Sequence, residues 1–246
     1  MSALAIIGGT GVAALSGLKI LREQWYSTPF GEPSGPFAFG ELHGKELAFL
    51  ARHGPGHRIP PHRINYRANI WALKQLGAPR IIAIAAVGGI SAEMWPSRLA
   101  FPHQIIDYTS SRAHTFFEST DVAVTHIDFT EPYSAELRTL LIQGAADAGL
   151  DVCNHGTYGA TQGPRLETAA EIDRLQRDGC TMVGMTGMPE AALARELELA
   201  YATCAVVANW AAGRSDAPIT IATLEANLKG GMEQVNRLLR AVIARL

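Results

Sequence analysis

The 246-residue chain has few cysteines, little net charge and no long apolar run. Its three cysteines are odd in number and have no CxxC spacing, which argues against a disulfide framework or a zinc knuckle. We therefore expect buried thiols at Cys153, Cys180 and Cys204. The 21 Lys and Arg nearly balance the 23 Asp and Glu, so no overall field attracts nucleic acid or an anionic membrane, and any polyanion site has to be local.

We expect no membrane span, targeting segment or linker in this chain. No stretch approaches the roughly 18 apolar residues that cross a bilayer, and the apolar N-terminal run is too short, with no basic residue before it, for a signal peptide. We therefore expect a soluble, cytoplasmic protein without membrane or nucleic-acid partners. Because no repeat, low-complexity tract or Pro/Ser-rich stretch divides the sequence, residues 1–246 are predicted to form a single domain.

Short β-branched runs that alternate with helical patterns are what the chain does contain. With 48% hydrophobic residues it can bury a large core, and the alternation is typical of an α/β sheet. The apolar run 81–87 indicates a strand covered on both faces. Strands are predicted at residues 4–7, 46–51, 80–87, 104–106, 156–161, 182–184 and 203–207. Helices are predicted at residues 65–76, 134–148, 168–177, 189–199 and about 220–246.

Local signals mark some of the helix ends. Thr168 followed by Glu171 fits a capping box, and Pro189 fits the first turn of a helix. The pair Gly230 and Gly231 can bend or break the last predicted helix.

Two turns that follow strands carry groups suited to an anion. Residues 8–11 are rich in glycine around Thr10, so turned backbone N–H groups and a hydroxyl can form an anion nest, although a plain tight turn explains them equally well. Residues 51–63 form an irregular basic loop that either grips a phosphate or is simply solvated. No carboxylate or cysteine accompanies its histidines, which argues against a metal site. The loop carries Arg52, Arg58, Arg63, His53, His57 and His62.

Two further segments are suited to a flat or apolar ligand. Gly88 and Gly89 end a buried run and permit close approach to the backbone, although a bulge fits them as well. Thr186 lies just before a predicted helix N-terminus, where free N–H groups favour an anion. Met185 and Leu166 offer soft apolar surface for a ring or a sugar face, but such residues more often belong to a core.

In order along nearly the whole chain, these segments resemble the trimeric purine nucleoside and 5'-methylthioadenosine phosphorylases of the nucleoside phosphorylase family. The resemblance implies a central mixed sheet flanked by helices and a homotrimer whose sites are completed by a neighbouring subunit. It also implies reversible cleavage of a purine nucleoside by inorganic phosphate, a co-substrate, with no cofactor and no metal. The matching motifs are Gly8-Gly-Thr-Gly11, Arg52-His-Gly54, Asn65-Tyr-Arg-Ala-Asn-Ile-Trp71, Gly163-Pro-Arg165 and Met185-Thr-Gly-Met-Pro-Glu190.

The same resemblance implies a role for each matching residue. Phosphate would be bound by Thr10, Arg52, His53, Ala86 and Thr186. The ribose and its 5'-methylthio group would contact Met185, His57 and, from a neighbouring subunit, His126. The base would contact Gly88, Leu166, Glu167, Asn209 and Ala211, with Asn209 as the catalytic residue that meets the departing purine. One departure is Ala85, where methylthioadenosine phosphorylases usually carry a phosphate-binding threonine.

Residues 209 and 211 predict which purine is cleaved. Aminopurine-specific relatives carry an Asp-x-Asp pair here, whereas this chain has Asn209 and Ala211. A carboxylate facing a 6-oxo group would leave buried acceptors unpaired at roughly 1–3 kcal/mol, so the neutral pair favours hypoxanthine, whose N1–H can donate to Glu167. We expect phosphorolysis of S-methyl-5'-thioinosine in preference to methylthioadenosine. The alternatives are a methylthioadenosine phosphorylase and a general 6-oxopurine nucleoside phosphorylase.

Three other functions fit parts of the pattern. A nucleosidase would use water in place of phosphate and would need a base to activate it. A non-catalytic nucleotide or sugar-phosphate sensor needs only the Gly-rich turn and the basic loop. A metal hydrolase would draw on the eight histidines and would lose its activity in chelator. Asn209 also fits a simple loop cap.

Overall fold

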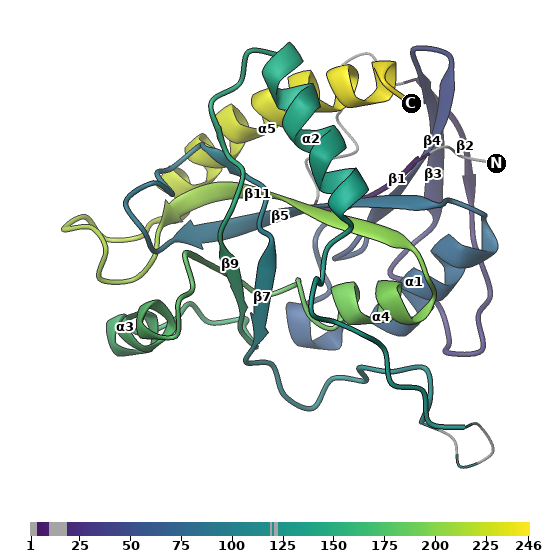
Figure 1. The fold of residues 1–246 in the computed structure, drawn as a ribbon, viewed down its shortest axis with the longest axis horizontal. Helices are drawn as coiled ribbons and strands as arrows, with labels where there is room; N and C mark the ends of the chain where they lie inside the picture. The colour runs from purple at the N-terminus through teal and green to yellow at the C-terminus, as the bar shows by residue number, and fades with distance from the viewer. Residues whose placement is uncertain (1–3, 10–18, 119, 121–122) are drawn as a thin grey trace.

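The fold is shown in Figure 1 as a computed structural model, which describes residues 4–9, 19–118, 120 and 123–246. Thr10, predicted to bind phosphate, lies outside the described residues. The strands are β1 (Leu4–Gly8), β2 (Lys19–Gln24), β3 (Phe37–Leu42), β4 (Lys45–Ala51), β5 (Arg80–Gly89), β6 (Leu99–Ala100), β7 (Gln104–Asp107), β8 (Val152–Cys153), β9 (Thr157–Ala160), β10 (Met182–Gly184) and β11 (Ala200–Trp210). The helices are α1 (Tyr66–Gln75), α2 (Ala135–Asp147), α3 (Ala169–Arg177), α4 (Glu190–Glu196) and α5 (Ile221–Ala244), with a short 3-10 helix η2 (Pro61–Arg63).

The sheet is organised around β5. The strands of the described residues form one sheet, whose main path runs β2-β3-β4-β1-β5-β10-β9-β7. β11 pairs in parallel along the whole of β5, β1 pairs in parallel near the start of β5, and β10 pairs antiparallel with its last two residues. The C-terminal end of β5 is therefore a point where the direction of pairing changes, and open α/β sheets bind ligands at such points.

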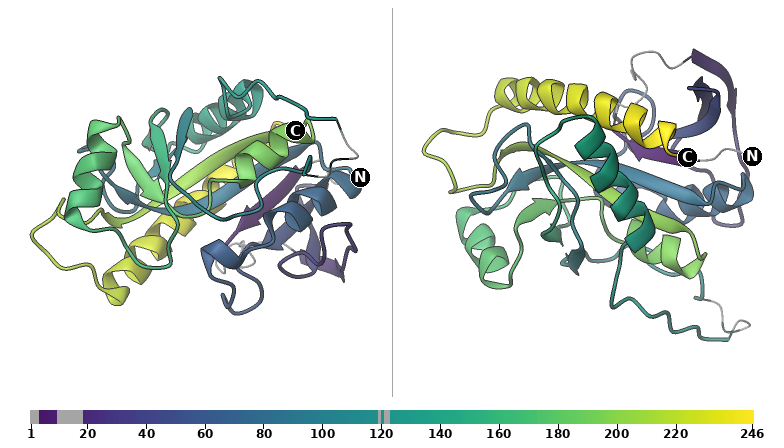
Figure 2. Two further views of the ribbon diagram at one scale, coloured as in Figure 1. Left: turned by 90° about the horizontal axis from the view of Figure 1, so that it is seen from below. Right: turned by 45° about the horizontal axis from the view of Figure 1, so that its top comes forward.

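Helices cover both faces of this sheet, as Figures 1 and 2 show. α2 and α5 cover one face, where Leu239 belongs to the same core as Ile82, and α1 and α4 cover the other, where Leu193 belongs to the same core as Ile81. Ile81 and Ile82 are neighbours in β5, so this strand is buried on both sides, as its apolar run predicts. The predicted α/β class, a mixed sheet flanked by helices, is confirmed.

All the predicted strands and helices are present, and the differences in their bounds and number have local causes. Residues 19–24 and 37–42 form a hairpin that the sequence did not predict, because β2 is exposed along its whole length and shows no alternation of apolar residues. β11 extends beyond the predicted 203–207 at both ends. The last helix is not interrupted at Gly230 and Gly231. A Cβ at Gly231 would collide with Val206, so this glycine lets the helix lie close against β11.

Side-chain caps fix several of the helix starts. The predicted capping box is present, with Thr168 and Glu171 each bonded to the backbone of the other. Asn65 and Ser134 cap α1 and α2 by a simpler arrangement, in which one side-chain oxygen accepts from a backbone N–H of the first turn. Pro189 precedes the first residue of α4, so the expectation that it lies in the first turn is wrong by one position.

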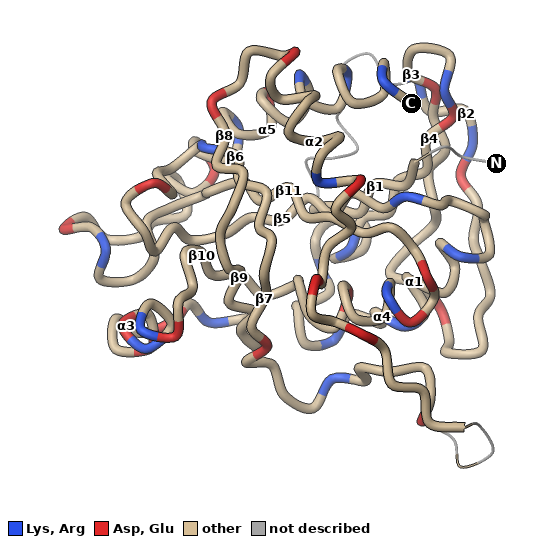
Figure 3. Tube along the Cα trace, viewed as in Figure 1, with Lys and Arg blue, Asp and Glu red and all other residues tan. Residues whose placement is uncertain are grey.

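Positions of Lys and Arg alternate with positions of Asp and Glu along the described chain, as the coloured trace in Figure 3 shows. With a formal net charge of -2 and both signs interspersed, the molecule has no strong overall field, so electrostatic attraction of a ligand depends on local groups. The three cysteines are free and buried, as predicted. Among the described residues, no helix has the length and apolar character that a bilayer crossing requires.

Candidate active site

A cavity of about 680 Å³ lies at the C-terminal end of β5, beside β10 and β11. This volume is within the range of small-molecule sites. The cavity brings together eleven of the thirteen residues to which the family resemblance assigns a role, and the missing two are Thr10, outside the described residues, and His126. The eleven are Arg52, His53, His57, Ala86, Gly88, Leu166, Glu167, Met185, Thr186, Asn209 and Ala211.

Two features of the paired strands direct residues into this cavity. Ala86 is exposed in the middle of β5, where its neighbours in the strand are buried, because it lines the cavity wall. In β11 the register against β5 shifts between Val207 and Asn209, which marks a bulge. Bulges re-aim side chains beside functional sites, and Asn209 and Ala211, both after this one, line the cavity.

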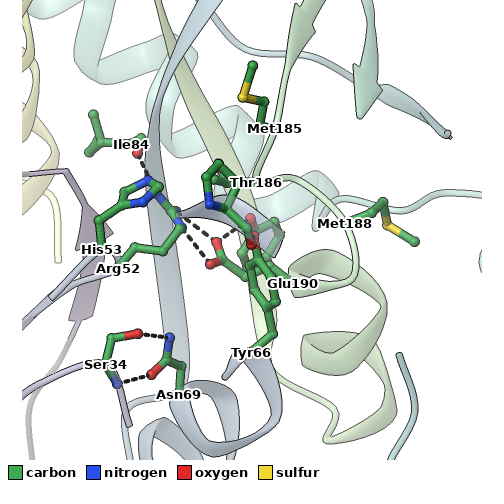
Figure 4. Close-up of polar contacts among 12 residues, drawn as sticks. Ser34, Arg52, His53, Tyr66, Asn69, Ile84, Met185, Thr186, Met188 and Glu190 are labelled. Carbon is green, nitrogen blue, oxygen red and sulfur yellow. Dashed lines mark hydrogen bonds and ion pairs between the residues drawn. The ribbon is translucent and has the colours of Figure 1, made fainter. Parts of the chain in front are cut away.

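Arg52 is held by a carboxylate that the sequence analysis left without a role. Its side chain is 2% exposed and donates from Nε and Nη2 to the two oxygens of Glu190, at 2.7 and 2.8 Å. It also donates from Nη1 to the carbonyl of Ile84 at 3.0 Å (Figure 4), and Tyr201 donates its hydroxyl to Glu190 at 2.8 Å. Burial lowers the pKa of the Arg52 guanidinium, but the charge and hydrogen bonds of Glu190 raise it by more. The pKa therefore lies above its ordinary value, and Arg52 stays protonated. The cavity wall thus holds a fixed guanidinium whose charge is balanced by Glu190.

Two histidines of the basic loop stack on one another at the cavity. The ring centroids of His53 and His57 are 4.2 Å apart, and Nδ1 of His53 lies 2.8 Å from the carbonyl oxygen of Ile59. Burial and the nearby Arg52 charge lower the pKa of His53 to about 4. At neutral pH the ring is therefore uncharged, and since a carbonyl only accepts, Nδ1 carries the proton and Nε2 is left as an acceptor.

The predicted base-binding residues have few partners within the protein. Nδ2 of Asn209 donates to the carbonyl of Trp210 at 2.6 Å, which leaves its second N–H and its oxygen for a ligand. Thr161 donates its hydroxyl to Oε1 of Glu167 at 2.6 Å. Ala211 is 3% exposed and presents only a methyl group. This part of the cavity therefore offers a neutral amide, one carboxylate and no acid at position 209 or 211.

An apolar part of the cavity comes from residues that the sequence analysis did not single out. Ile219 precedes α5, and Leu224 and Leu228 lie in its first turns, four residues apart and so on one face of the helix. Apolar residues at this spacing look the same in a sequence whether they face a core or a cavity. They give the site a surface suited to an uncharged, apolar substituent.

Thr186 lines the cavity and lies just before the start of a helix, as expected, because the N–H of Ala191 donates to the carbonyl of Gly187 at 3.1 Å. α4 begins four residues later, at Glu190, and the backbone N–H of Thr186 donates to the hydroxyl of Tyr158 at 3.4 Å. What this segment offers an anion is the Thr186 hydroxyl, in a side chain that is 7% exposed.

A second buried arginine, Arg112, ties together two segments of the cavity wall. Its Nη1 donates to the carbonyls of Met185 and Met188 at 2.9 and 2.6 Å, and its Nη2 donates to the carbonyls of Thr161 and Gln162 at 3.2 and 2.9 Å. The segment that contains Met185 and the segment that leads to Glu167 are thus held in a fixed relative position by one guanidinium. Nothing in the sequence distinguishes this arginine from an ordinary loop residue.

His126 is exposed and does not line the cavity of its own chain. It belongs to the irregular segment between β7 and α2, which projects from the body of the molecule in Figures 1 and 2. Glu196 binds the first half of this segment to α4: its carboxylate accepts from the Thr115 hydroxyl at 2.7 Å and from the Phe116 N–H at 2.8 Å. A role for His126 therefore requires the cavity of a neighbouring subunit.

Donor atoms of the kinds that bind metals come together outside the cavity, at Glu93, Cys153 and His155, within the part of the chain that the structure describes. The Cys153 sulfur lies 3.1 Å from Nδ1 of His155, and Nε2 of His155 lies 3.6 Å from Glu93. Burial raises the pKa of the Cys153 thiol, so the thiolate that a metal prefers is disfavoured. None of the three residues lines the cavity.

Comparisons with known proteins give matches over nearly the whole chain. Residues 3–244 match the family described as the Phosphorylase superfamily. The chain is 55% identical over 244 residues to a probable S-methyl-5'-thioinosine phosphorylase of Pseudomonas syringae pv. tomato, covering 99% of both chains. It is 47% identical to a 6-oxopurine nucleoside phosphorylase of Pyrococcus furiosus, covering 99% of this chain and 92% of the other. The structure is similar to a methylthioadenosine phosphorylase of Schistosoma mansoni bound to adenine, with a TM-score of 0.93 and 31% identity, covering 99% and 91% of the two chains.

Proposed function

The chain belongs to the phosphorylase superfamily, and we propose that it is a purine nucleoside phosphorylase that prefers S-methyl-5'-thioinosine. The products are hypoxanthine and 5-methylthioribose 1-phosphate. The observation that carries the proposal is the composition of the cavity, which joins an anion-binding wall to a base-binding wall with a neutral amide in place of acids. The relatives of this chain include a probable S-methyl-5'-thioinosine phosphorylase and a 6-oxopurine nucleoside phosphorylase, which agrees with a 6-oxopurine substrate.

On the phosphate side, the side chains bind an oxyanion through hydrogen bonds and charge, without a covalent bond. Arg52 supplies fixed N–H donors, Thr186 supplies a hydroxyl, and Nε2 of neutral His53 accepts from a protonated phosphate oxygen. Ala86, exposed in β5, leaves room for the anion at the strand. Positioning phosphate under C1' of the ribose lets a phosphate oxygen form the new C1'–O bond while the C1'–N9 bond breaks.

On the base side, the electron pair of the broken bond passes to the purine. The free N–H of Asn209 donates to N7, where negative charge develops, so this hydrogen bond strengthens as the bond breaks. Glu167 accepts from N1–H, and Thr161 holds its other oxygen. Adenine has no proton at N1, so its acceptor would face the Glu167 carboxylate and the complex would be weaker.

The 5' substituent selects among 6-oxopurine nucleosides. Ile219, Leu224 and Leu228 provide an apolar surface that suits a methylthio group better than a hydroxyl. We further propose a homotrimer in which the projecting segment with His126 completes the site of a neighbouring subunit. A purine nucleoside phosphorylase without that preference for sulfur is the second candidate, because 6-oxopurine relatives are also nearly half identical to this chain.

Steady-state assays of methylthioinosine, methylthioadenosine, inosine and guanosine, each with and without phosphate, test the proposal. We expect phosphate-dependent release of hypoxanthine, fastest from methylthioinosine. Hydrolysis in the absence of phosphate would indicate a nucleosidase, and preference for methylthioadenosine would contradict the role given to Asn209. Equal rates for inosine would favour the second candidate, and loss of activity in chelator would indicate a metal hydrolase.

A further inference from the structure

The charge balance of the cavity leaves the phosphate co-substrate short of positive charge. Three charged side chains line the described part of the cavity: Arg52, Arg58 and Glu167. Arg52 shares its charge with Glu190, which is completely buried and bonded to it through both oxygens, so the pair is neutral as a whole. Phosphate carries between one and two negative charges near pH 7, and a neutral pair attracts it only through its N–H groups.

The other groups near Arg52 do not correct this deficit. His53 is neutral near pH 7 because its pKa is lowered to about 4, and its Nδ1 proton is directed at Ile59. Glu167 adds a negative charge on the base side. Residues 10–18, which lie outside the described part of the chain, contain no Lys, Arg, Asp or Glu, so they bring no charged side chain.

Arg58 is placed to supply the missing charge. It lies on the same loop as Arg52 and directly follows His57, whose ring stacks on His53. Its side chain lines the cavity and is exposed, and it forms no ion pair with any residue that the structure describes. A flexible, unpaired cation at the edge of a cavity raises the local concentration of anions and the rate at which they enter.

We propose that Arg58 is the phosphate-recruiting residue of this site, the side chain whose uncompensated positive charge draws the oxyanion to the neutral Arg52–Glu190 pair. This inference rests on the proposed phosphorolysis. It assigns Arg52 and Arg58 different tasks: Arg52 orients the bound anion through fixed donors, and Arg58 supplies net charge. The contribution of Arg58 is therefore expected to weaken with ionic strength, because it comes from an exposed group.

Arg63 provides a matched control, because it is an exposed arginine of the same basic loop that does not line the cavity. In Arg58→Gln we expect the KM for phosphate to rise about tenfold, with the KM for methylthioinosine and the kcat at saturating phosphate within about twofold of wild type. The salt dependence of kcat/KM for phosphate should flatten in Arg58→Gln and persist in Arg63→Gln. Arg58→Lys, which keeps the charge, should recover most of the phosphate affinity.

Several results would overturn the inference. They are equal phosphate KM values in Arg58→Gln and Arg63→Gln, a rise in the KM for the nucleoside instead of phosphate, or an Arg58→Lys variant as impaired as Arg58→Gln. A wild-type enzyme that shows no phosphate-dependent turnover would contradict the proposed function itself. The two failures are distinguishable, since the first set is measured on a wild-type reference that requires phosphate.

Discussion

The phosphate-binding and base-binding parts of the cavity are stabilised in different ways. Arg52 uses three of its five N–H groups for partners within the protein, two for Glu190 and one for Ile84. Asn209 and Glu167 each have one described side-chain bond, to Trp210 and Thr161, and keep other polar atoms for a ligand. The Arg52 side of the cavity is thus held by buried bonds within the protein, whereas the base-binding residues are held by fewer bonds and keep polar atoms for a ligand.

This difference separates stability from specificity. A substitution that unpairs a buried charge destabilises the folded state, because the remaining group has no water to replace its partner. A substitution among groups that face the cavity mainly changes which ligand satisfies them. Variants of the buried Arg52–Glu190 pair are therefore expected to lose stability and activity together, and base-side variants are expected to redirect activity at little cost in stability.

The largest effect is expected for Glu190→Ala, which leaves the Arg52 guanidinium buried without a counter-charge. Loss of one partner of a buried ion pair destabilises a protein by about 3–5 kcal/mol. Denaturant unfolding monitored by circular dichroism measures the change. Glu136→Ala is the control, because its carboxylate forms an exposed pair with Arg80, and such pairs contribute about 0–1 kcal/mol. Equal losses in the two variants would show that Glu190 is not needed to hold Arg52.

A smaller effect is expected for Glu167→Gln on the base-binding wall. The amide oxygen of the glutamine can still accept from Thr161, which turns its NH2 group toward the N1–H of hypoxanthine, so donor faces donor. Loss of a hydrogen bond to a charged group is worth about 1.5–3 kcal/mol, or roughly ten- to a hundredfold in kcat/KM for methylthioinosine. The value for methylthioadenosine, whose N1 accepts, should not fall. An equal decrease for both nucleosides would show that Glu167 does not recognise N1.

A still smaller effect is expected for the double variant Asn209→Asp with Ala211→Asp, which introduces the acid pair of aminopurine-specific relatives. We expect the ratio of kcat/KM for methylthioadenosine to that for methylthioinosine to rise at least tenfold, equivalent to about 1.4 kcal/mol. Each single variant serves as a control for the other position. If the ratio does not change in any of the three, purine specificity is determined outside positions 209 and 211.

The sequence predicted most of the cavity because its motifs, in order along the chain, resemble those of the nucleoside phosphorylase family, and that resemblance implies the roles of Ala86, Met185 and Asn209. In the structure these residues converge because β5, β10 and β11 lie side by side and their ends meet at the cavity. The partners that hold them could not be predicted. Glu190 looks like an ordinary acid in the first turn of a helix, and only the three-dimensional structure places it against Arg52, 138 residues away. Exposed β2 was missed for the opposite reason, because it has no apolar face to give a periodic signal.

The smallest effect concerns pH and the buried imidazole on the phosphate side. The pKa of His53 is lowered to about 4 in the folded protein, against an ordinary value of about 6.5 in the unfolded chain. Between these values the unfolded chain binds more protons, so the His53 contribution favours folding above pH 6.5 and is lost as the pH falls toward 4. Between pH 6.5 and 5.5 the loss amounts to at most about 1.4 kcal/mol. His53→Gln, which cannot titrate, should show a correspondingly flatter decline in unfolding free energy over this interval. Parallel declines in the two proteins would mean that His53 is protonated without penalty, and the anion-binding wall would then carry a second positive charge.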